Sequence, residues 1–436
     1  MSGGGLGRRS AGSKQIRRPS KRPSLKQNIV KNLRSVRRKI RRKIRRKVRR
    51  WTAFVGAPSK RAFLKRKILK TFIVYREEQA RLPAILRWAW VRKVHLSTRH
   101  LHGPKKIAYA MDELVVVCLV RDGRPYIKAF IDHYLSLGVK HIVFLDNDSG
   151  DGTVDVAREY ERVTVIQSKL PYKNYQFAMK AYLISRFGKG RWSLYVDIDE
   201  LFDYPYSDVV SLSSLLRYLN EKSYTAVAAQ HLDMFSDRAL SNPISKKDKK
   251  DEPLKELYRL YDISNISRED YSGRFDRKSN TIANDNIKIH NGGIRKTLFD
   301  GNPRLTKHPL IFVDGKVRHR DMGFHRIKNA RIADFSCVLY HYKLVGGLRE
   351  QLARDLQEGR YPRVLLPGYT QYHDVLEQNP DINIKQDTAR ELGSVDELID
   401  NEFIVVSEEY RKWADRERGT RDRHPHRRDQ GPGERS

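Results

Sequence analysis

The chain has 436 residues, 39% of them hydrophobic, which is enough for one large domain or two smaller ones with a sizeable core. Its formal net charge of +35 is placed unevenly. Residues 1–110 contain 35 of the 87 Lys and Arg residues but only two acidic residues, Glu77 and Glu78, so residues 111–436 are nearly neutral. The overall charge therefore describes the start of the chain and does not indicate an anionic substrate for the rest.

The sequence also argues against a membrane-spanning protein and against a zinc-binding one. No apolar stretch approaches the roughly 18–20 residues that span a bilayer as a helix. The two cysteines, Cys118 and Cys337, lie in separate apolar runs without a CxxC neighbour, which gives no sign of a zinc site and suits a reducing compartment. We therefore expect a cytoplasmic protein, with peripheral attachment to a membrane left open.

The start of the chain is predicted to be a basic arm. Residues 1–30 are rich in Gly, Ser, Pro and basic residues, which is typical of disorder. In the following SVRRKIRRKIRRKVRRW, an apolar residue recurs every four positions, which on a helix makes a thin apolar stripe on a densely charged cylinder. A helix over residues 31–51 suits an anionic membrane surface, and Trp51 favours that interpretation. Binding to nucleic-acid phosphates is the alternative that we do not favour, and a solubilising extension is the third.

A second basic region precedes the body of the protein. The stretch RAFLKRKILKTFIVYREEQARLPAILRWAWVRKV is amphipathic, so residues 51–110 are predicted to be a helical linker that extends the same surface or packs on the body. The body is predicted to cover residues 111–410. Residues 411–436 are rich in Arg, Asp and His and are predicted to be a disordered tail.

Strands and helices alternate through the first part of the body. Strands are predicted at residues 114–120, 141–145, 163–167 and 192–196, and helices at residues 126–137 and 175–187. The run LVVVCLV is apolar throughout, as in a strand that is buried on both faces of a parallel sheet. The alternation predicts an α/β fold with a mostly parallel sheet flanked by helices, preceded by the basic extension.

Polar side chains follow two of these strands. Asp197 and Asp199 come directly after a strand in WSLYVDIDE, and Asp146 and Asn147 begin the turn-rich DNDSGDGT after another. Ligands of parallel α/β sheets bind at the carboxyl ends of the strands. Asp-x-Asp alone is common by chance, but at this position the pair can hold Mg²⁺ or Mn²⁺ together with diphosphate oxygens. The residues therefore predict a site for a nucleotide-activated substrate.

The ordered series of motifs resembles a known family. No GxGxxG follows the first strand and no GxxxxGK[ST] occurs, so a dinucleotide fold and a Walker-type ATPase are poorly supported. The stretches CLVRDGRPYIKAFIDHYLSLGVKHIVFLDNDSGDGT and VDIDELFDYP resemble the family 2-like glycosyltransferases of the GT-A fold, in the branch whose metal motif reads Asp-x-Asp-Glu. NGGIRKTLF, LTKHPLIF and VLYHYKLVGGLREQLARDLQEGRY resemble later blocks of that branch, so the likeness covers about residues 112–410.

The resemblance implies a hexosyltransferase-type enzyme that moves a sugar from a nucleotide-diphospho-sugar to an acceptor hydroxyl with Mn²⁺ or Mg²⁺. It places Asp197 and Asp199 in the metal motif, with Asp199 as the more direct ligand and Asp197 touching the nucleotide ribose or the metal. Asp146 and Asn147 match the loop that binds the nucleotide base, although an acid is often found in place of Asn147. Arg121 would flank the nucleotide. A tight turn capped by Asp146 is the alternative for this loop.

Later basic residues complete the expected site. His341 matches a late histidine that often completes the metal shell in this fold, and a core histidine bonded to a carbonyl is the alternative. Lys343 is expected to offset diphosphate charge. Arg295 and Lys307 are further candidates for contacts to the diphosphate or the acceptor, with a loop turn and a surface cation as the alternatives.

The resemblance also implies inversion at the sugar carbon, which requires a carboxylate to take the acceptor proton. Asp233 and Asp237, in AAQHLDMFSDRAL, are the candidate bases, and the sequence does not choose between them. The expected acceptor is a cell-envelope glycan or another glycan or lipid-linked molecule. The competing interpretation from another class is a catalytically inactive glycosyltransferase-like scaffold, whose basic arm binds anionic membrane or nucleic acid.

Overall fold

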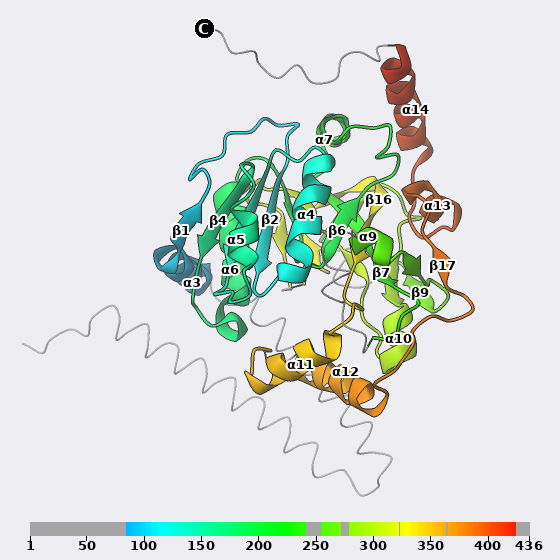
Figure 1. Ribbon diagram of the computed structural model, residues 1–436. Helices are drawn as coiled ribbons and strands as arrows, with labels where there is room; N and C mark the ends of the chain where they lie inside the picture. Colours follow the sequence, from blue (N-terminus) through cyan, green and yellow to red (C-terminus); the bar gives the residue numbers. More distant parts are fainter. Residues whose placement is uncertain (1–83, 241–253, 272–278, 322, 363–364, 424–436) are drawn as a thin grey trace, which may run out of the picture. The chain divides into compact units, whose positions relative to one another are not determined.

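The computed structural model describes residues 84–240, 254–271, 279–321, 323–362 and 365–423 (Figure 1). All of them belong to one of the two units into which the chain divides, residues 72–436. The predicted membrane-binding helix at residues 31–51, the segment before it that is predicted to be disordered, residues 52–83 of the predicted linker and the end of the chain after residue 423 lie outside the described residues.

A mixed sheet forms the centre of the fold, with the strand order β1-β4-β3-β2-β5-β13-β7-β16-β10. β4, β3, β2 and β5 pair in parallel, as do β7, β16 and β10, and the antiparallel β13 joins the two groups. This confirms the predicted α/β class with a mostly parallel sheet. The bounds of these strands are Arg99–His102 (β1), Val163–Gln167 (β4), His141–Asp146 (β3), Val115–Val120 (β2), Trp192–Tyr195 (β5), Leu310–Phe312 (β13), Ala226–Phe235 (β7), Arg331–His341 (β16) and Thr281–Ile282 (β10).

Helices cover both faces of this sheet (Figure 1). Successive strand side chains point to opposite faces, so β2 gives Val116 and Cys118 to one hydrophobic core and Val115 and Val117 to the other. This explains why the strand is apolar at every position. The helices on the first face are α4 (Arg124–Ser136), α5 (Thr153–Ala157) and α7 (Leu212–Glu221), and those on the second are α3 (Ala84–Ser97) and α6 (Tyr172–Phe187).

Shorter elements extend the sheet and its surroundings. β6 pairs antiparallel with β16, and α11 packs against α12. The bounds are Glu200–Asp203 (β6), Leu260–Tyr261 (β8), Ile266–Glu269 (β9), Ile289–Gly292 (β11), Thr306–Lys307 (β12), Arg318–His319 (β14), Ile327–Lys328 (β15), Arg390–Glu391 (β17), Leu254–Leu257 (α9), Ile294–Phe299 (α10), Leu348–Gln357 (α11), Leu366–Gln378 (α12), Val395–Asp400 (α13) and Glu408–Arg423 (α14).

The body begins earlier than the sequence predicted. β1 pairs antiparallel with β4, with Arg99 opposite Gln167, so it joins the edge of the main sheet. Val94 of α3 is fully buried, and the ring of Trp90 lies 5.9 Å from that of Tyr175 on α6. Of the two alternatives for the predicted helical linker at residues 51–110, the described residues 84–102 follow the one in which the segment packs on the body. A few apolar residues within the basic run bury enough surface to hold α3 against the domain.

The body also ends later than predicted. α14 continues to Arg423, where the sequence predicted disorder from residue 411. Tyr410 is fully buried, with its ring stacked on Phe335 at 4.1 Å, and the ring of Trp413 lies 4.7 Å from that of Tyr218. The high charge of this segment belongs to the outer side of a helix. Its aromatic side chains, three residues apart on one face, anchor the helix to the core.

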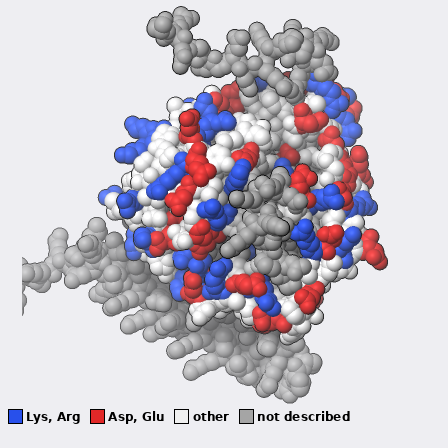
Figure 2. Space-filling view, in the orientation of Figure 1, with Lys and Arg blue, Asp and Glu red and all other residues white. Residues whose placement is uncertain are grey.

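The predicted strands of the first half agree with the structure, while α6 begins at Tyr172 instead of Tyr175. The chain turns sharply after β5, where the Glu200 amide donates to the carbonyl oxygen of Asp197 at 3.0 Å. Figure 2 shows Lys and Arg interspersed with Asp and Glu over the face around α4, as the near-neutral composition of the body requires. Within the described part of the chain, no helix is both long and apolar enough to cross a membrane.

Candidate active site

Three neighbouring strands place titratable side chains on one face of the sheet. β16 lies between β6 and β7, with His341 opposite Glu200 on one side and opposite Asp233 on the other. His231 lies two residues before Asp233 on β7 and therefore faces the same way. All four side chains are buried. Polar groups inside a sheet must pair with one another or bind a ligand, because their burial is otherwise costly.

His341 lies between two carboxylates. Its Nδ1 is 2.6 Å from Oδ1 of Asp233, and its Nε2 is 3.6 Å from Oδ2 of Asp199. Arg295 of α10 donates from Nε to the other oxygen of Asp233 at 2.7 Å. Burial raises the pKa of Asp233, but Arg295 and His341 outweigh it and hold that pKa below its ordinary value. Asp233 therefore has both oxygens engaged and fixes the imidazole with Nε2 toward Asp199.

The pair formed by Asp199 and His341 fits a divalent cation. Their 3.6 Å separation is too long for a hydrogen bond. Two ligand atoms of one ion with bonds of about 2.1 Å lie at most about 4.2 Å apart, so one cation can contact both after a small adjustment of the side chains. A histidine that ligates a metal usually donates its other ring N–H to a carboxylate, as Nδ1 of His341 can to Asp233. The Asp199 side chain is 22% exposed, so an ion can reach it.

Asp197 has a different environment from Asp199. Lys180 of α6 and the Tyr195 hydroxyl donate to its Oδ1 at 3.1 and 3.0 Å, and Lys307 of β12 donates to its Oδ2 at 3.2 Å. Burial raises the pKa of Asp197, but the two ammonium groups outweigh it and hold the pKa below its ordinary value. The two aspartates of the motif are therefore not equivalent: protein cations already compensate Asp197.

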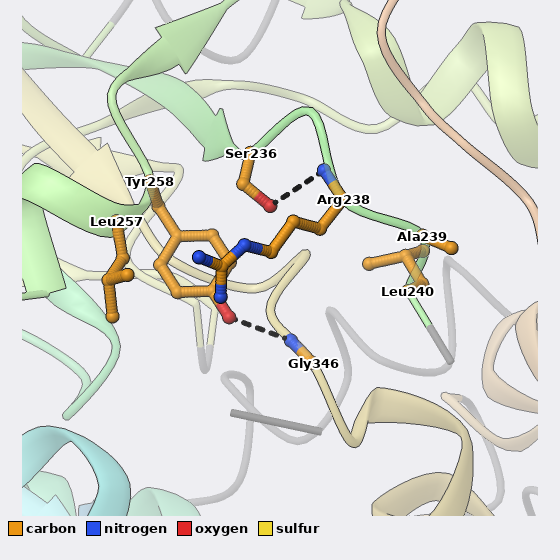
Figure 3. A pocket seen from close by; sticks show the side chains of 7 residues that line it. All are labelled: Ser236, Arg238, Ala239, Leu240, Leu257, Tyr258 and Gly346. Atoms are coloured by element: carbon orange, nitrogen blue, oxygen red, sulfur yellow. Dashed lines mark hydrogen bonds between the residues drawn. The ribbon is translucent and has the colours of Figure 1, made fainter. Parts of the chain in front are cut away.

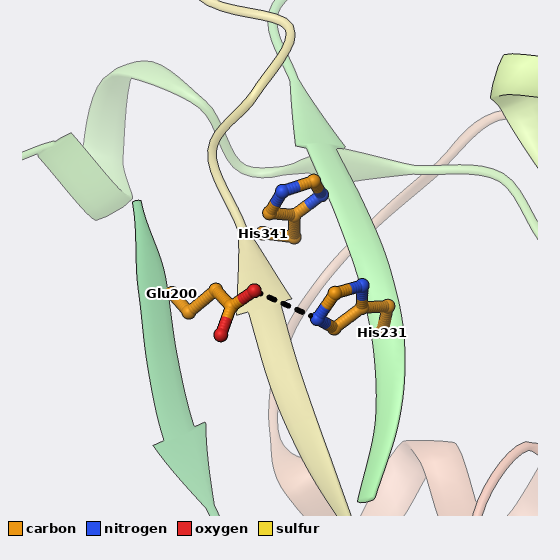
Figure 4. A group of neighbouring side chains, drawn as sticks. All are labelled: Glu200, His231 and His341. Atoms are coloured by element: carbon orange, nitrogen blue, oxygen red, sulfur yellow. Dashed lines mark ion pairs between the residues drawn. The ribbon is translucent and has the colours of Figure 1, made fainter. Parts of the chain in front are cut away.

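Glu200 and His231 lie next to the His341 ring (Figure 4). Nε2 of His231 is 3.0 Å from Oε1 of Glu200, and the two imidazoles stack with centroids 4.6 Å apart. Burial lowers the pKa of His231 to about 4, so its ring is neutral and has the lone pair that a metal ligand needs. Glu200, His231 and His341 place possible ligand atoms within 4.8 Å of one another. Lys307 also contacts Glu200, however, and already compensates its charge.

Formal charges in the site balance when histidines are counted as neutral. Lys343 follows His341 by two residues, and its ammonium lies 5.1 Å from the ring centroid of Tyr369. Burial lowers the pKa of Lys343, but Tyr369 and then Asp199 outweigh it and raise that pKa. Four carboxylates are therefore offset by four cations. A dication and a diphosphate can enter such a site together with little change of net charge, whereas either one alone disturbs the balance. The carboxylates are Asp197, Asp199, Glu200 and Asp233, and the cations are Lys180, Arg295, Lys307 and Lys343.

Helix α12 adds an aromatic wall beside the cations. The ammonium of Lys343 lies 5.1 Å from the ring centroid of Tyr369, and Tyr369 stacks on Tyr361 at 3.9 Å. Tyr372, one turn further along the helix, stacks on Phe299 at 4.1 Å. Stacked rings lose little conformational freedom on binding a ligand and present a rigid surface. The site thus has an apolar side as well as a charged one.

The loop after β3 is held by hydrogen bonds within itself and to the segment that follows β4. The carboxylate of Asp146 accepts from its own loop, from the amides of Asp148 and Ser149 at 3.1 and 3.2 Å. Asn147 donates from Nδ2 to the carbonyl of Ser168 at 2.6 Å, while its buried Oδ1 has no hydrogen-bond partner among the described residues. Asp146 thus shapes the loop, and Asn147 keeps one acceptor available.

Arg121 lies apart from the charged cluster. Its side chain is partly exposed, with nitrogens 3.7 Å from Asp122 and 3.8 Å from Glu358. Arg360 links the same Asp122, at 2.9 Å, to Asp355 of α11, at 3.0 Å. These ion pairs connect the loop after β2 to the helical pair α11–α12 and keep that pair at the same edge of the sheet.

The two candidate bases occupy different places. Asp233 is buried with both oxygens engaged, whereas Asp237 is exposed in the loop after β7, where its backbone carbonyl accepts from Asn383 at 2.9 Å. Among the described residues, the structure brings Asp197, Asp199, Asp233 and the cations of the site together, but it does not bring Asp237 into that cluster.

Three members of the cluster, Glu200, His231 and Lys180, were not predicted as site residues. Glu200 directly follows Asp199 in the Asp-x-Asp-Glu motif. His231 is spaced two residues from Asp233 in a strand, and that spacing was the signal that both face the same site. Lys180 lies in the middle of α6 and meets Asp197 only through tertiary packing. Nothing in the sequence around Lys180 distinguishes it from a surface lysine.

A small pocket lies close to the cluster, beyond the ends of β7 and β16 (Figure 3). Arg238 extends across it past the ring of Tyr258, whose hydroxyl accepts from the Gly346 amide at 3.1 Å. Its volume of about 10 Å³ is that of about one water molecule. The pocket therefore cannot take a sugar or a nucleotide.

Comparisons with known proteins give partial likenesses. No family model and no curated protein matches the chain. It is similar to the crystal structure of S. aureus TarS 1–349, with 16% identity and a TM-score of 0.22 over 30% of this chain and 42% of that one. A second structure of S. aureus TarS gives 15% identity and a TM-score of 0.22 over 31% of this chain and 26% of that one.

A third similarity is to UDP-glucose pyrophosphorylase complexed with UDP-glucose. The identity is 7% and the TM-score 0.17, over 35% of this chain and 67% of that one. The chain spans less than half the length of the TarS chains that it matches. At these scores the likenesses do not show a family, and the argument for function rests on the site itself.

Proposed function

We propose that the protein is a metal-dependent glycosyltransferase, which moves a sugar from a nucleotide-diphospho-sugar to an acceptor hydroxyl. The observation that carries the proposal is the pair of Asp199 and His341, 3.6 Å apart and held by Asp233 and Arg295. The pair follows the carboxyl end of β5 and ends β16 in an α/β sheet, where ligands of such sheets bind. Mn²⁺ or Mg²⁺ is the cation that carboxylate and imidazole ligands of this kind suit.

The cations of the site bind the diphosphate in this proposal. Lys343 and Arg295 supply positive charge, and Arg295 has a buried Nη2 without a hydrogen-bond partner among the described residues. The metal, when bound, supplies Lewis-acid stabilisation of the departing diphosphate. Because the site is balanced before ligands enter, Mn²⁺ and a nucleoside diphosphate should each raise the affinity for the other.

Asp233 acts in this proposal as a positioning residue. Its two engaged oxygens hold His341 in one orientation, and its burial and its ion pair with Arg295 make it a poor base for an acceptor proton. Of the two carboxylates considered as a base for an inverting transfer, Asp237 is the one with an exposed side chain. Tyr369 and Tyr372 give the sugar an apolar wall next to Lys343.

The loops after β2 and β3 hold the nucleoside. Oδ1 of Asn147 is an acceptor for an N–H of the base, and Asp146 keeps the loop in shape for it. Arg121, partly exposed at the same edge, contacts the phosphates or the ribose. The acceptor is proposed to be a glycan or a lipid-linked molecule, and the reaction an inverting one.

The experiment is a donor panel with two readouts. Binding of Mn²⁺ and of each nucleotide-diphospho-sugar is measured by titration calorimetry, and donor hydrolysis and transfer are measured with and without Mn²⁺. The proposal expects Mn²⁺-dependent donor binding in the wild type and at least tenfold weaker Mn²⁺ binding in Asp199→Asn. Chelation should abolish turnover, and added Mn²⁺ should restore it.

A matched control is Asp155→Asn on α5, because the Asp155 side chain is 74% exposed and makes only a surface contact with Arg158 at 3.5 Å. It should behave as the wild type. Failure of a folded wild-type protein to bind any donor with any metal would contradict the proposal and favour the inactive scaffold.

A further inference from the structure

Helix α3 has two distinct faces. One packs on the body: Val94 is fully buried, Nδ1 of His95 lies 3.2 Å from the Tyr182 hydroxyl, and Trp90 contacts Tyr175. The other face contains Trp88, which is exposed, whereas Val94 on the first face is buried. Residues four apart on a helix share one face, so Trp88, Arg92 and Leu96 form a stripe that lies beside the face packed on the body, with Trp88 and Arg92 on the side toward α6.

This outer stripe exposes large apolar side chains. Trp88 is 61% exposed and Leu96 is 71% exposed. Among the described residues, four large hydrophobic side chains are exposed, and two of those four lie on this one helix. Such a concentration marks an interaction surface more often than chance exposure does.

An open groove lies beside the stripe. It has a volume of about 580 Å³ and lies between α3 and α6, lined in part by Trp88, Val91, Tyr182 and Arg186. The guanidinium of Arg92 lies 5.4 Å from the ring of Trp88. In a protein surface that binds lipid, cationic side chains contact the headgroups while apolar side chains enter the boundary with the acyl chains. Arginines at the rim of an apolar groove fit that arrangement.

Neither of the two helices contains an acidic residue. α3 reads AILRWAWVRKVHLS and α6 reads YKNYQFAMKAYLISRF. Every other described helix of ten or more residues contains at least one Asp or Glu. The body as a whole is nearly neutral, so this acid-free pair is a local feature. Each Lys or Arg near an anionic membrane contributes about 1 kcal/mol of attraction.

We propose that the outer surface of α3 and α6, formed by Trp88, Arg92, Leu96 and Arg186, docks on an anionic lipid bilayer. Trp88 and Leu96 enter the interfacial layer, and Arg92 and Arg186 contact the lipid phosphates. The inference is independent of the proposed glycosyltransferase activity. Exposed Leu96 favours a bilayer over nucleic acid, because a strand of nucleic acid offers no apolar layer for an aliphatic side chain.

The basic N-terminal region can hold the whole protein on a vesicle, so binding of the full-length chain does not show which surface touches the lipid. The test therefore uses a probe that reports on α3 alone. An environment-sensitive NBD group is attached to Leu96→Cys. Both native cysteines are fully buried, and mock labelling of the wild type checks that they stay unlabelled. Vesicles of phosphatidylglycerol and phosphatidylcholine, vesicles of phosphatidylcholine alone, and duplex DNA are compared.

The expected result is a blue shift of the probe and protection from an aqueous quencher with the anionic vesicles only. The control is the same probe at Lys128→Cys, because the Lys128 side chain is 74% exposed on α4, which covers the opposite face of the sheet. A probe at Leu96→Cys that responds no more than the one at Lys128→Cys would overturn the proposal. A response to DNA but not to vesicles would overturn it in favour of nucleic acid.

A second measurement does not depend on labelling. Trp88→Ala with Leu96→Ala removes exposed side chains and should leave the thermal unfolding midpoint unchanged. It should weaken partition to the anionic vesicles about tenfold, because two interfacial anchors are lost. Partition that stays unchanged at a salt concentration high enough to screen the basic N-terminal region would contradict the docking of this surface.

Discussion

Strands β2 and β7 are both buried at every position, yet they differ in what they bury. β2 reads VVVCLV and places only apolar atoms in the two cores. β7 reads AVAAQHLDMF and buries His231 and Asp233 as well, beside charged and polar partners. A buried strand in this fold can therefore serve packing alone, or packing and chemistry together.

The difference lies in where the partners come from. The residues of β2 need no specific partner, because dispersion and the hydrophobic effect are not directional. Asp233 needs Arg295 and His341, which lie 62 and 108 residues away along the chain. We call β2 to β5 the apolar half of the sheet, and β6, β7 and β16, which bear the charged cluster, the polar half. The apolar half should tolerate substitutions that preserve volume. The polar half should tolerate only substitutions that preserve or replace both members of a buried pair.

The largest expected effect comes from breaking a buried pair in the polar half. Asp233→Ala should lower the free energy of unfolding by about 3–5 kcal/mol, because it leaves the charge of Arg295 buried without its carboxylate. Urea unfolding followed by circular dichroism measures the change. Asp233→Leu combined with Arg295→Met should recover most of the stability while Mn²⁺ binding stays weak. If Asp233→Ala is as stable as the wild type, the buried pair of Asp233 and Arg295 does not contribute to stability as we expect.

A cavity in the apolar half should cost somewhat less and act differently. Ile142→Ala in β3 removes buried methyl groups and should lower the free energy of unfolding by about 3 kcal/mol. Calorimetry should find Mn²⁺ binding unchanged, because Ile142 lies in the apolar core between Val116 and Val163 of the neighbouring strands. Ile142→Val serves as the control with a loss of about 1 kcal/mol. Weakened Mn²⁺ binding in either variant would show that the two halves are coupled.

A smaller effect is expected from pH through His133, which lies on α4 with Nε2 2.8 Å from the carbonyl of Phe202. Burial lowers the pKa of His133 to about 3, from about 6.5 in the unfolded chain. The stabilisation it contributes is present above pH 6.5 and is lost as the pH falls toward 3. Between pH 7 and pH 5 this loss is about 2 kcal/mol.

Unfolding in urea at both pH values measures this loss, and His133→Gln should reduce the difference between them. The carboxylates of the polar half respond in a separate window. Burial raises the pKa of Asp199, but His341 outweighs it and lowers that pKa to about 2. The stabilisation from Asp199 is therefore lost only as the pH falls below about 4. If His133→Gln loses as much free energy of unfolding between pH 7 and pH 5 as the wild type, that loss does not come from His133.

Much of the fold could be predicted because it depends on local patterns. The apolar run of β2, the strands β3 to β5 and the helices between them follow from periodicity and turn residues alone. The two ends of the body could not be predicted in this way. Val94 in α3 and Tyr410 and Ala414 in α14 are isolated buried residues in highly charged segments, and their burial depends on surfaces formed by distant parts of the chain.

The sequence by itself determined the α/β class and pointed to Asp197, Asp199 and His341, because strand alternation and the position of polar residues at strand ends are local properties. Only the tertiary structure decided how these residues differ. It tied Asp197 to Lys180 and Lys307, and it left Asp199 facing His341. Pairing between charges far apart in the chain depends on strand order and helix packing, which no local pattern specifies.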